Sequence, residues 1–116
     1  MGKELLQLIT QTEKLSNEKR YVEIIALLSV KLLEQLKNAA LYEWLARAHD
    51  ELSEKELAFL YANKAISIDA SFPLPYNTRG NVWFDKKEYD KATNEYNKAI
   101  TLYGKRAHAY FKQFHV

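Results

Sequence analysis

The second half of the chain repeats itself at a fixed spacing of 34 residues. Residues 58–68, AFLYANKAISI, align without a gap with residues 92–102, ATNEYNKAITL. Upstream of these two segments, Tyr42 and Tyr76 are separated by the same 34 residues. A fixed period of this length is typical of stacked supersecondary units, and a period of about 34 residues suits a helix–turn–helix unit. The pattern therefore predicts an array of helical hairpins, an architecture that presents an extended surface to a partner.

Composition supports a helical protein and narrows the classes of partner. Three glycines and two prolines leave little material for turns, which favours helices. The absence of cysteine excludes disulfides and thiolate metal sites. A net charge of +2, from 17 basic and 15 acidic residues, gives no strong attraction to nucleic acid or to anionic membranes, and no apolar run is long enough to span a bilayer. We therefore expect a cytoplasmic protein without nucleic-acid or membrane partners.

Hydrophobic periodicity and helix-breaking residues together place the expected helices. The segment Ser53-Glu54-Lys55-Glu56 has the form of a capping box at the start of a helix. Pro73 or Pro75 suits the first turn of a later helix, and Gly104 suits the position just past a helix end. These signals predict seven helices, over residues 3–15, 20–37, 38–52, 54–68, 73–86, 88–103 and 105–114.

Residues 73–106 resemble a tetratricopeptide repeat. The family's six small or aromatic positions are filled by Tyr76, Gly80, Trp83, Ala92, Tyr96 and Ala99. Residues 39–72 match less fully, through Tyr42, Leu45, Ala46, Ala58 and Ala65, and residues 5–38 match only in register. The resemblance implies an all-α, right-handed helical-hairpin solenoid of about three repeats in a single domain, residues 1–116. Its parts are a divergent repeat 5–38, repeats 39–72 and 73–106, and a terminal helix 107–116.

In this family the first helix of each repeat lines a concave groove that binds peptides or protein segments. The resemblance therefore implies a non-catalytic protein-interaction module, with groove positions at Glu43, Arg47, Asp50, Leu74, Asn77, Asn81, Phe84, His108 and Phe111. Asn77 and Asn81 can equally form a solvated helix face, which is the ordinary position of such residues. Members that bind the acidic C-terminal tails of chaperones use basic and amide residues at positions held here by Glu43, Arg47, Thr78, His108 and Lys112. Only Lys112 suits that role, so we do not expect chaperone tails as ligands.

The titratable residues give no sign of catalysis. His49 lies on the predicted packing stripe of its helix, where a hydrogen-bonded core histidine is the usual outcome. His108 and His115 are seven residues apart, roughly 10 Å along a helix, which is too far to chelate one ion. Glu13, Glu23 and Glu43 are expected at solvent-facing positions. With no phosphate-binding loop or nucleophile motif, we expect no enzyme activity, metal or cofactor.

The C-terminal end suggests a second class of function. Tyr110 and Phe114 lie on a last helix with no following helix to cover them, and an exposed apolar end favours self-association. Tyr89, Tyr96, Tyr103 and Tyr110 also recur every seven residues. Either Gly104 ends the sixth helix, or the sixth and seventh helices fuse into one that can exchange between two copies. The alternative function is therefore a structural, self-associating protein whose contacts are its helical ends, with a homodimer as one form.

Overall fold

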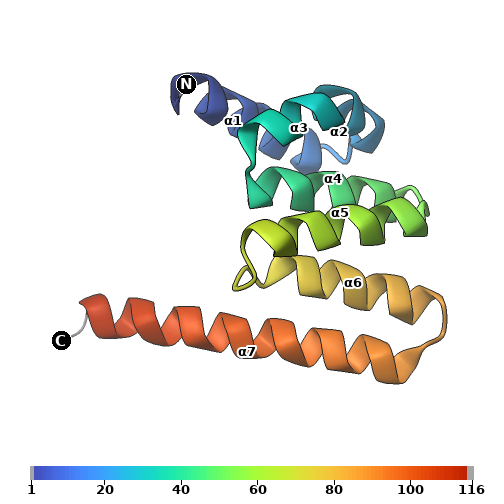
Figure 1. The fold of residues 1–116 in the computed structure, drawn as a ribbon, viewed down its shortest axis with the longest axis vertical. Coiled ribbons are helices and arrows are strands. Elements are labelled where there is room, and N and C mark those ends of the chain that lie inside the picture. The colour runs from blue at the N-terminus through green and yellow to red at the C-terminus, as the bar shows by residue number, and fades with distance from the viewer. Residues whose placement is uncertain (1, 115–116) are drawn as a thin grey trace.

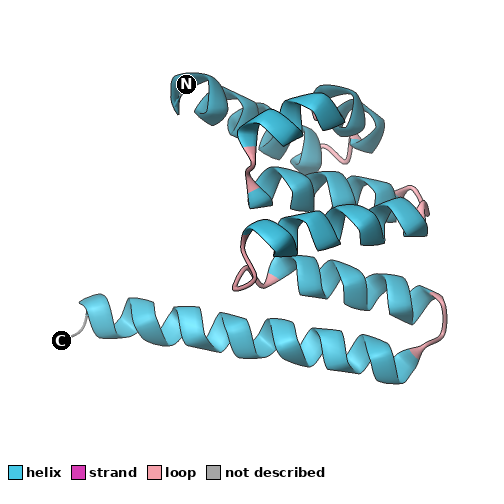
Figure 2. Ribbon diagram, in the orientation of Figure 1, coloured by secondary structure: helices cyan, strands magenta, loops and turns pink. Residues whose placement is uncertain are grey.

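Helices joined by short loops make up the whole of the described chain (Figures 1 and 2). The computed structural model describes the backbone of residues 2–114 and the side chains of residues 2–106. Successive helices pack antiparallel, which confirms the predicted all-α class. The described residues form α1 (Gly2–Asn17), α2 (Tyr21–Leu27), α3 (Val30–Leu36), α4 (Ala39–Glu51), α5 (Lys55–Ile68), α6 (Leu74–Asp85) and α7 (Tyr89–Phe114).

The turns α1–α2, α4–α5 and α6–α7 have the same backbone geometry. Each contains a left-handed residue, and these residues are 34 positions apart: Lys19 (φ 57°), Ser53 (φ 62°) and Lys87 (φ 63°). In each turn the N–H of the residue after the left-handed one donates to the carbonyl five residues earlier, at 2.9, 2.8 and 2.9 Å. The N–H of the left-handed residue itself donates to the carbonyl three residues earlier. This is the Schellman arrangement, which satisfies the last carbonyls of a helix.

The α4–α5 boundary was predicted at the right place but for the wrong reason. Ser53 is left-handed and belongs to the end of α4, so it cannot cap α5. Glu54 holds the N-cap position, and its side chain makes no capping hydrogen bond. Its carboxylate lies 2.9 Å from Nδ1 of His49 instead. The predicted capping box is therefore absent.

The predicted helix over residues 20–37 is divided in two. Leu28 ends α2, and Ser29 has an extended backbone with ψ of 147°. The Ser29 hydroxyl accepts a hydrogen bond from the N–H of Leu32 at 3.3 Å and so caps α3. A serine inside an apolar run offers the backbone this alternative to continuous helix. The apolar periodicity on both sides of Ser29 concealed the break.

At the C-terminus the opposite occurs, and two predicted helices are one. The α7 helix runs without interruption from Tyr89 to Phe114, past Gly104, which does not adopt a positive φ. The prediction that Gly104 ends the helix is wrong, and the two helices are fused as in the alternative, whose exchange between two copies stays a prediction. The guanidinium of Arg106 lies 3.4 Å from the carboxylate of Asp69 and above the ring of Phe72, two contacts beyond Gly104 that favour the continued helix. The last turns extend beyond the other helices (Figure 1).

The core changes character along the chain. Around α2 to α5 it is built from large aliphatic side chains, among them Ile24, Leu28, Leu33, Leu41 and Leu45. Between α6 and α7 it depends on one small residue. A Cβ at Gly80 would lie 2.5 Å from Cε1 of Tyr96, so only glycine lets this aromatic ring pack against α6. Alanines at buried positions of α5 and α7, including Ala58, Ala65, Ala92 and Ala99, let neighbouring helices approach closely.

Candidate functional site

The predicted groove residues of α4 and α6 lie along the line where these two helices pack, which we call the α4–α6 seam. Glu43 of α4 contacts Thr78 of α6 near one end of the seam. Asp50 and Asp85 meet through Lys55 near the other end. Arg47 lies between Glu43 and Asp50 on α4, and Asn81 lies between Thr78 and Asp85 on α6. Helical spacing therefore places Arg47 and Asn81 at about the same level of the seam.

Glu43 is buried, which corrects the expectation of a solvent-facing carboxylate available to a ligand. Its side chain is 2% exposed. The hydroxyl of Thr78 donates to Glu43 Oε2 at 2.6 Å, while Oε1 has no hydrogen-bond partner. Burial raises the pKa of this carboxyl from 4.5 to about 7, against the opposing effects of the Thr78 hydrogen bond and the Arg47 charge. Glu43 therefore joins two helices and is not open to a partner.

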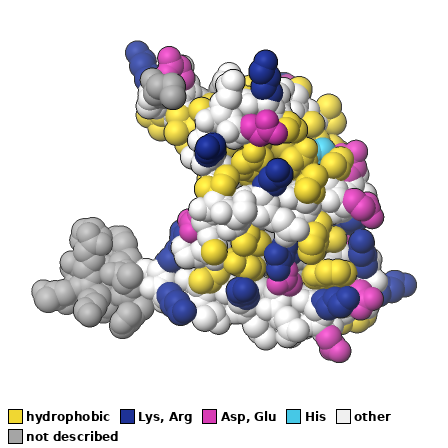
Figure 3. Space-filling model, in the orientation of Figure 1, with side chains coloured by type: hydrophobic (Ala, Val, Ile, Leu, Met, Phe, Trp, Pro, Cys, Tyr) yellow, Lys and Arg dark blue, Asp and Glu magenta, His cyan; other side chains and the backbone are white. Residues whose placement is uncertain are grey.

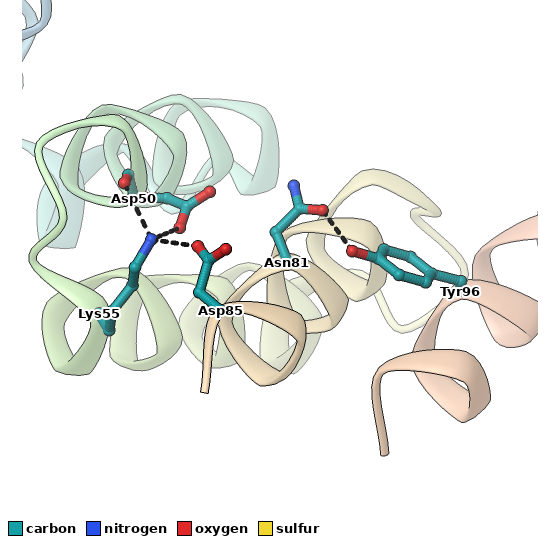
Figure 4. A network of polar contacts seen from close by, with 5 residues as sticks. All are labelled: Asp50, Lys55, Asn81, Asp85 and Tyr96. Atoms are coloured by element: carbon teal, nitrogen blue, oxygen red, sulfur yellow. Dashed lines mark hydrogen bonds and ion pairs between the residues drawn. The ribbon is translucent and has the colours of Figure 1, made fainter. Parts of the chain in front are cut away.

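Asp50 is also engaged within the protein (Figure 4). The ammonium group of Lys55, in the first turn of α5, lies 2.9 Å from Asp50 Oδ1 and 3.3 Å from its backbone oxygen. The same ammonium group pairs with Asp85 of α6. One lysine thus bridges two carboxylates from two helices. This pairing fixes the end of the seam and leaves one net negative charge among the three groups.

The side-chain oxygen of Asn81 is hydrogen-bonded within the described chain, whereas its NH₂ group is not. The hydroxyl of Tyr96 donates to Asn81 Oδ1 at 2.6 Å, which anchors the amide over α7. Its NH₂ group points away from Tyr96 and makes no hydrogen bond to any described residue (Figure 4). The anchored amide can donate to a ligand without first losing an internal bond.

Three other predicted residues present open groups. Arg47 and Asn77 are exposed, and neither side chain forms a hydrogen bond or ion pair with the described residues. The ring of Phe84 is 53% exposed and touches the edge of Tyr89, with ring centroids 5.3 Å apart. Leu74 is half-buried at the start of α6. His108, Phe111, Tyr110 and Phe114 lie outside the residues whose side chains are described.

A second polar cluster, between α5, α6 and α7, was not predicted as a feature. Arg79 forms a two-pronged ion pair with Glu95 and donates to Asn63 at 3.0 Å. Its guanidinium also lies 5.4 Å from the ring centroids of Phe59 and Tyr76. The cluster lines a shallow hollow of about 350 Å³. The only sequence signal for this cluster is Arg79, which stands where the resembled family prefers leucine. The hydrogen bonds of Arg79 join α6 to α5 and α7.

The remaining titratable groups do not assemble into a metal site in the described part of the chain. His49 is a buried core residue, as predicted: it stacks on Tyr61 with centroids 5.4 Å apart and pairs with Glu54. Acidic and basic side chains are interspersed on the face drawn in Figure 3. Among the described helices, none is both long and apolar enough to cross a membrane.

Comparison with known proteins gives this chain no family. No protein-family model matches the sequence, and no curated protein is significantly similar to it. The function therefore has to be argued from the seam itself.

Proposed function

We propose that this protein is a tetratricopeptide-like interaction module without catalytic activity, which binds an extended peptide or protein segment along the α4–α6 seam. The repeated turn geometry carries the architectural part of this proposal. Three hairpins that turn at Lys19, Ser53 and Lys87 with the same backbone bonds are what a 34-residue helical repeat requires. Stacked hairpins of this kind align their first helices on one face.

The free groups of the seam define the chemistry of the ligand. Arg47, Asn77 and the NH₂ group of Asn81 are all donors, and the acidic residues beside them are buried or paired. A segment with backbone carbonyls or a carboxylate in this stretch supplies the matching acceptors. The half-exposed ring of Phe84 gives an apolar side chain of the ligand a surface to pack on. An extended segment that carries an acidic residue near an apolar residue, in either chain direction, fits these groups.

A library of random peptides displayed on phage tests the proposal without knowledge of the natural partner. Peptides enriched on the wild-type protein are synthesised, and their affinities are measured by fluorescence anisotropy. The seam variant carries Arg47→Ala and Asn77→Ala, and we expect its affinity to fall at least tenfold, since each lost charged or amide hydrogen bond is worth about 1 kcal/mol or more.

A matched control separates the seam from the rest of the surface. Lys64→Ala with Asn94→Ala removes the same kinds of groups from exposed positions of α5 and α7. The control should bind the selected peptides like the wild type. Failure to enrich any peptide, or equal loss in both variants, would contradict binding along the seam.

A further inference from the structure

Glu43 and Arg47, one buried and one exposed, are neighbours on the seam face of α4. They are four residues apart, a spacing that places two side chains on the same side of a helix with their Cβ atoms about 6 Å apart. The carboxyl of Glu43 is buried, whereas Arg47 is exposed and has no hydrogen bond or ion pair to the described residues. A ligand carboxylate that pairs with Arg47 therefore comes close to Glu43 without touching it.

The surroundings of the Glu43 carboxyl favour its neutral form. The hydroxyl of Thr78 donates to Oε2, but Oε1 is buried and accepts no hydrogen bond from the described residues. Ionisation would leave a charged oxygen without water or a donor, which is costly inside a protein. Burial is accordingly the main cause that raises the pKa of Glu43 to about 7, so both of its forms are populated near neutral pH.

The charged groups around Glu43 leave Arg47, among the described residues, as the one that a ligand can change. Arg47 favours the ionised carboxylate, and Asp50, itself bound by Lys55, opposes it. Thr78, the group of α6 that meets Glu43, carries no charge. The charged side chains on the helices beside α4 are exposed or paired with other groups, among them Glu13 of α1, Glu23 of α2, Lys55 of α5, and Arg79 and Asp85 of α6. Pairing Arg47 with a ligand carboxylate therefore removes the charge that favours ionised Glu43.

The charge of the ligand and the proton on Glu43 are thus coupled. We propose that Glu43 takes up a proton from solvent when a ligand carboxylate pairs with Arg47, so that the seam binds acidic segments more tightly at low pH than at high pH. This regulation rests on the proposed function, since it needs a ligand on the seam. Thermodynamic linkage requires the converse as well: an ionised Glu43 weakens the ion pair between Arg47 and the ligand. Glu43 controls the affinity for acidic segments without contacting them.

Removal of the Arg47 charge tests the coupling without any ligand. Carbon-13 NMR follows the titration of the Glu43 carboxyl in the full chain, and the midpoint in Arg47→Gln should lie at higher pH than in the wild type. Lys64→Gln removes an exposed cation of α5 and should leave the midpoint unchanged. A midpoint that stays the same in Arg47→Gln overturns the proposal.

Binding across the neutral pH range tests the coupling with a ligand. The probes are synthetic peptides from the phage selection that contain one acidic residue and no histidine. From about pH 6 to about pH 8 their affinity for the wild type should fall about three- to fivefold. Glu43→Gln, which keeps an uncharged side chain of the same shape, should bind them equally at both pH values. Glu56→Gln, at a side chain that is 86% exposed, should keep the wild-type dependence.

A change in the peptide gives the same test without altering the protein. Replacement of its acidic residue by the matching amide should abolish the pH dependence on the wild type. Acidic peptides that bind the seam equally at both pH values, or a pH dependence that survives Glu43→Gln, would overturn the proton coupling and leave the proposed peptide binding intact. A library that enriches no peptide would overturn both.

Discussion

The first hairpin and the two that follow share their turns but not their second helices. Thr12, Ala46 and Gly80 are buried at the same 34-residue register. So are Ile24, Ala58 and Ala92. The correspondence fails further along, where Ala65 and Ala99 are buried but Lys31 is exposed. The chain breaks at Ser29, two residues before that position, so the second helix of the first hairpin ends before the register at which Ala65 and Ala99 are buried.

The difference between the hairpins can be tested by exchanging the residues at positions 31 and 65, which share the same register. Ala65→Lys places the residue of the first hairpin at a fully buried position of α5. We expect a loss of about 3–5 kcal/mol in unfolding free energy, because an unpaired charge would be buried. The reciprocal substitution Lys31→Ala, at an exposed site, should change the unfolding free energy by no more than about 0.5 kcal/mol. Urea denaturation of the two variants measures both values, and similar effects would show that the two sites are equivalent after all.

Glu43 distinguishes the second hairpin from its neighbours, because the same register holds Ile9 in the first and exposed Asn77 in the third. With a pKa raised from 4.5 to about 7, the folded state binds more protons than the unfolded state between these values. The unfolding free energy should therefore fall by roughly 3 kcal/mol as the pH rises through this range. Denaturation from about pH 5 to about pH 8 should show this slope in the wild type and not in Glu43→Gln. An equal slope in both proteins would assign the effect to other groups.

The sequence predicted those features that depend on local signals. The start of α6 follows from Pro73 and Pro75, and the exposure of Asn77 and Phe84 follows from helical periodicity. The break at Ser29 was missed because the apolar periodicity continues on both sides of it. The continuity through Gly104 was predicted only as the alternative to a helix end, since it depends on contacts that Arg106 makes with distant residues. The burial of Glu43 was hidden for the same reason: its partner Thr78 lies 35 residues away.

Gly80 and Gly104 test whether glycine has one role or two in the third hairpin. Gly80→Ala would force the Tyr96 ring away from α6, and we expect a loss of about 1–3 kcal/mol despite the better helix propensity of alanine. Gly104→Ala meets open space and should gain about 0.5–1 kcal/mol. Thermal unfolding of both variants gives the signs. In a Tyr96→Ala background the cost at Gly80 should shrink or vanish, and a cost that persists there would locate the strain elsewhere.

Glycine substitutions in the three turns compare the hairpins where they are most alike, and we expect them to have the smallest effect on stability. Lys19, Ser53 and Lys87 each hold a left-handed backbone, which costs a residue with a Cβ about 1–2 kcal/mol and costs glycine little. Part of the gain from glycine is lost to the greater entropy of the unfolded chain, so each substitution by glycine should stabilise by up to about 1 kcal/mol. Because the three turns make the same backbone bonds, the three gains should agree when measured by chemical denaturation. A gain at Ser53 and Lys87 without one at Lys19 would mean that the first hairpin differs from the others in its turn as well as in its second helix.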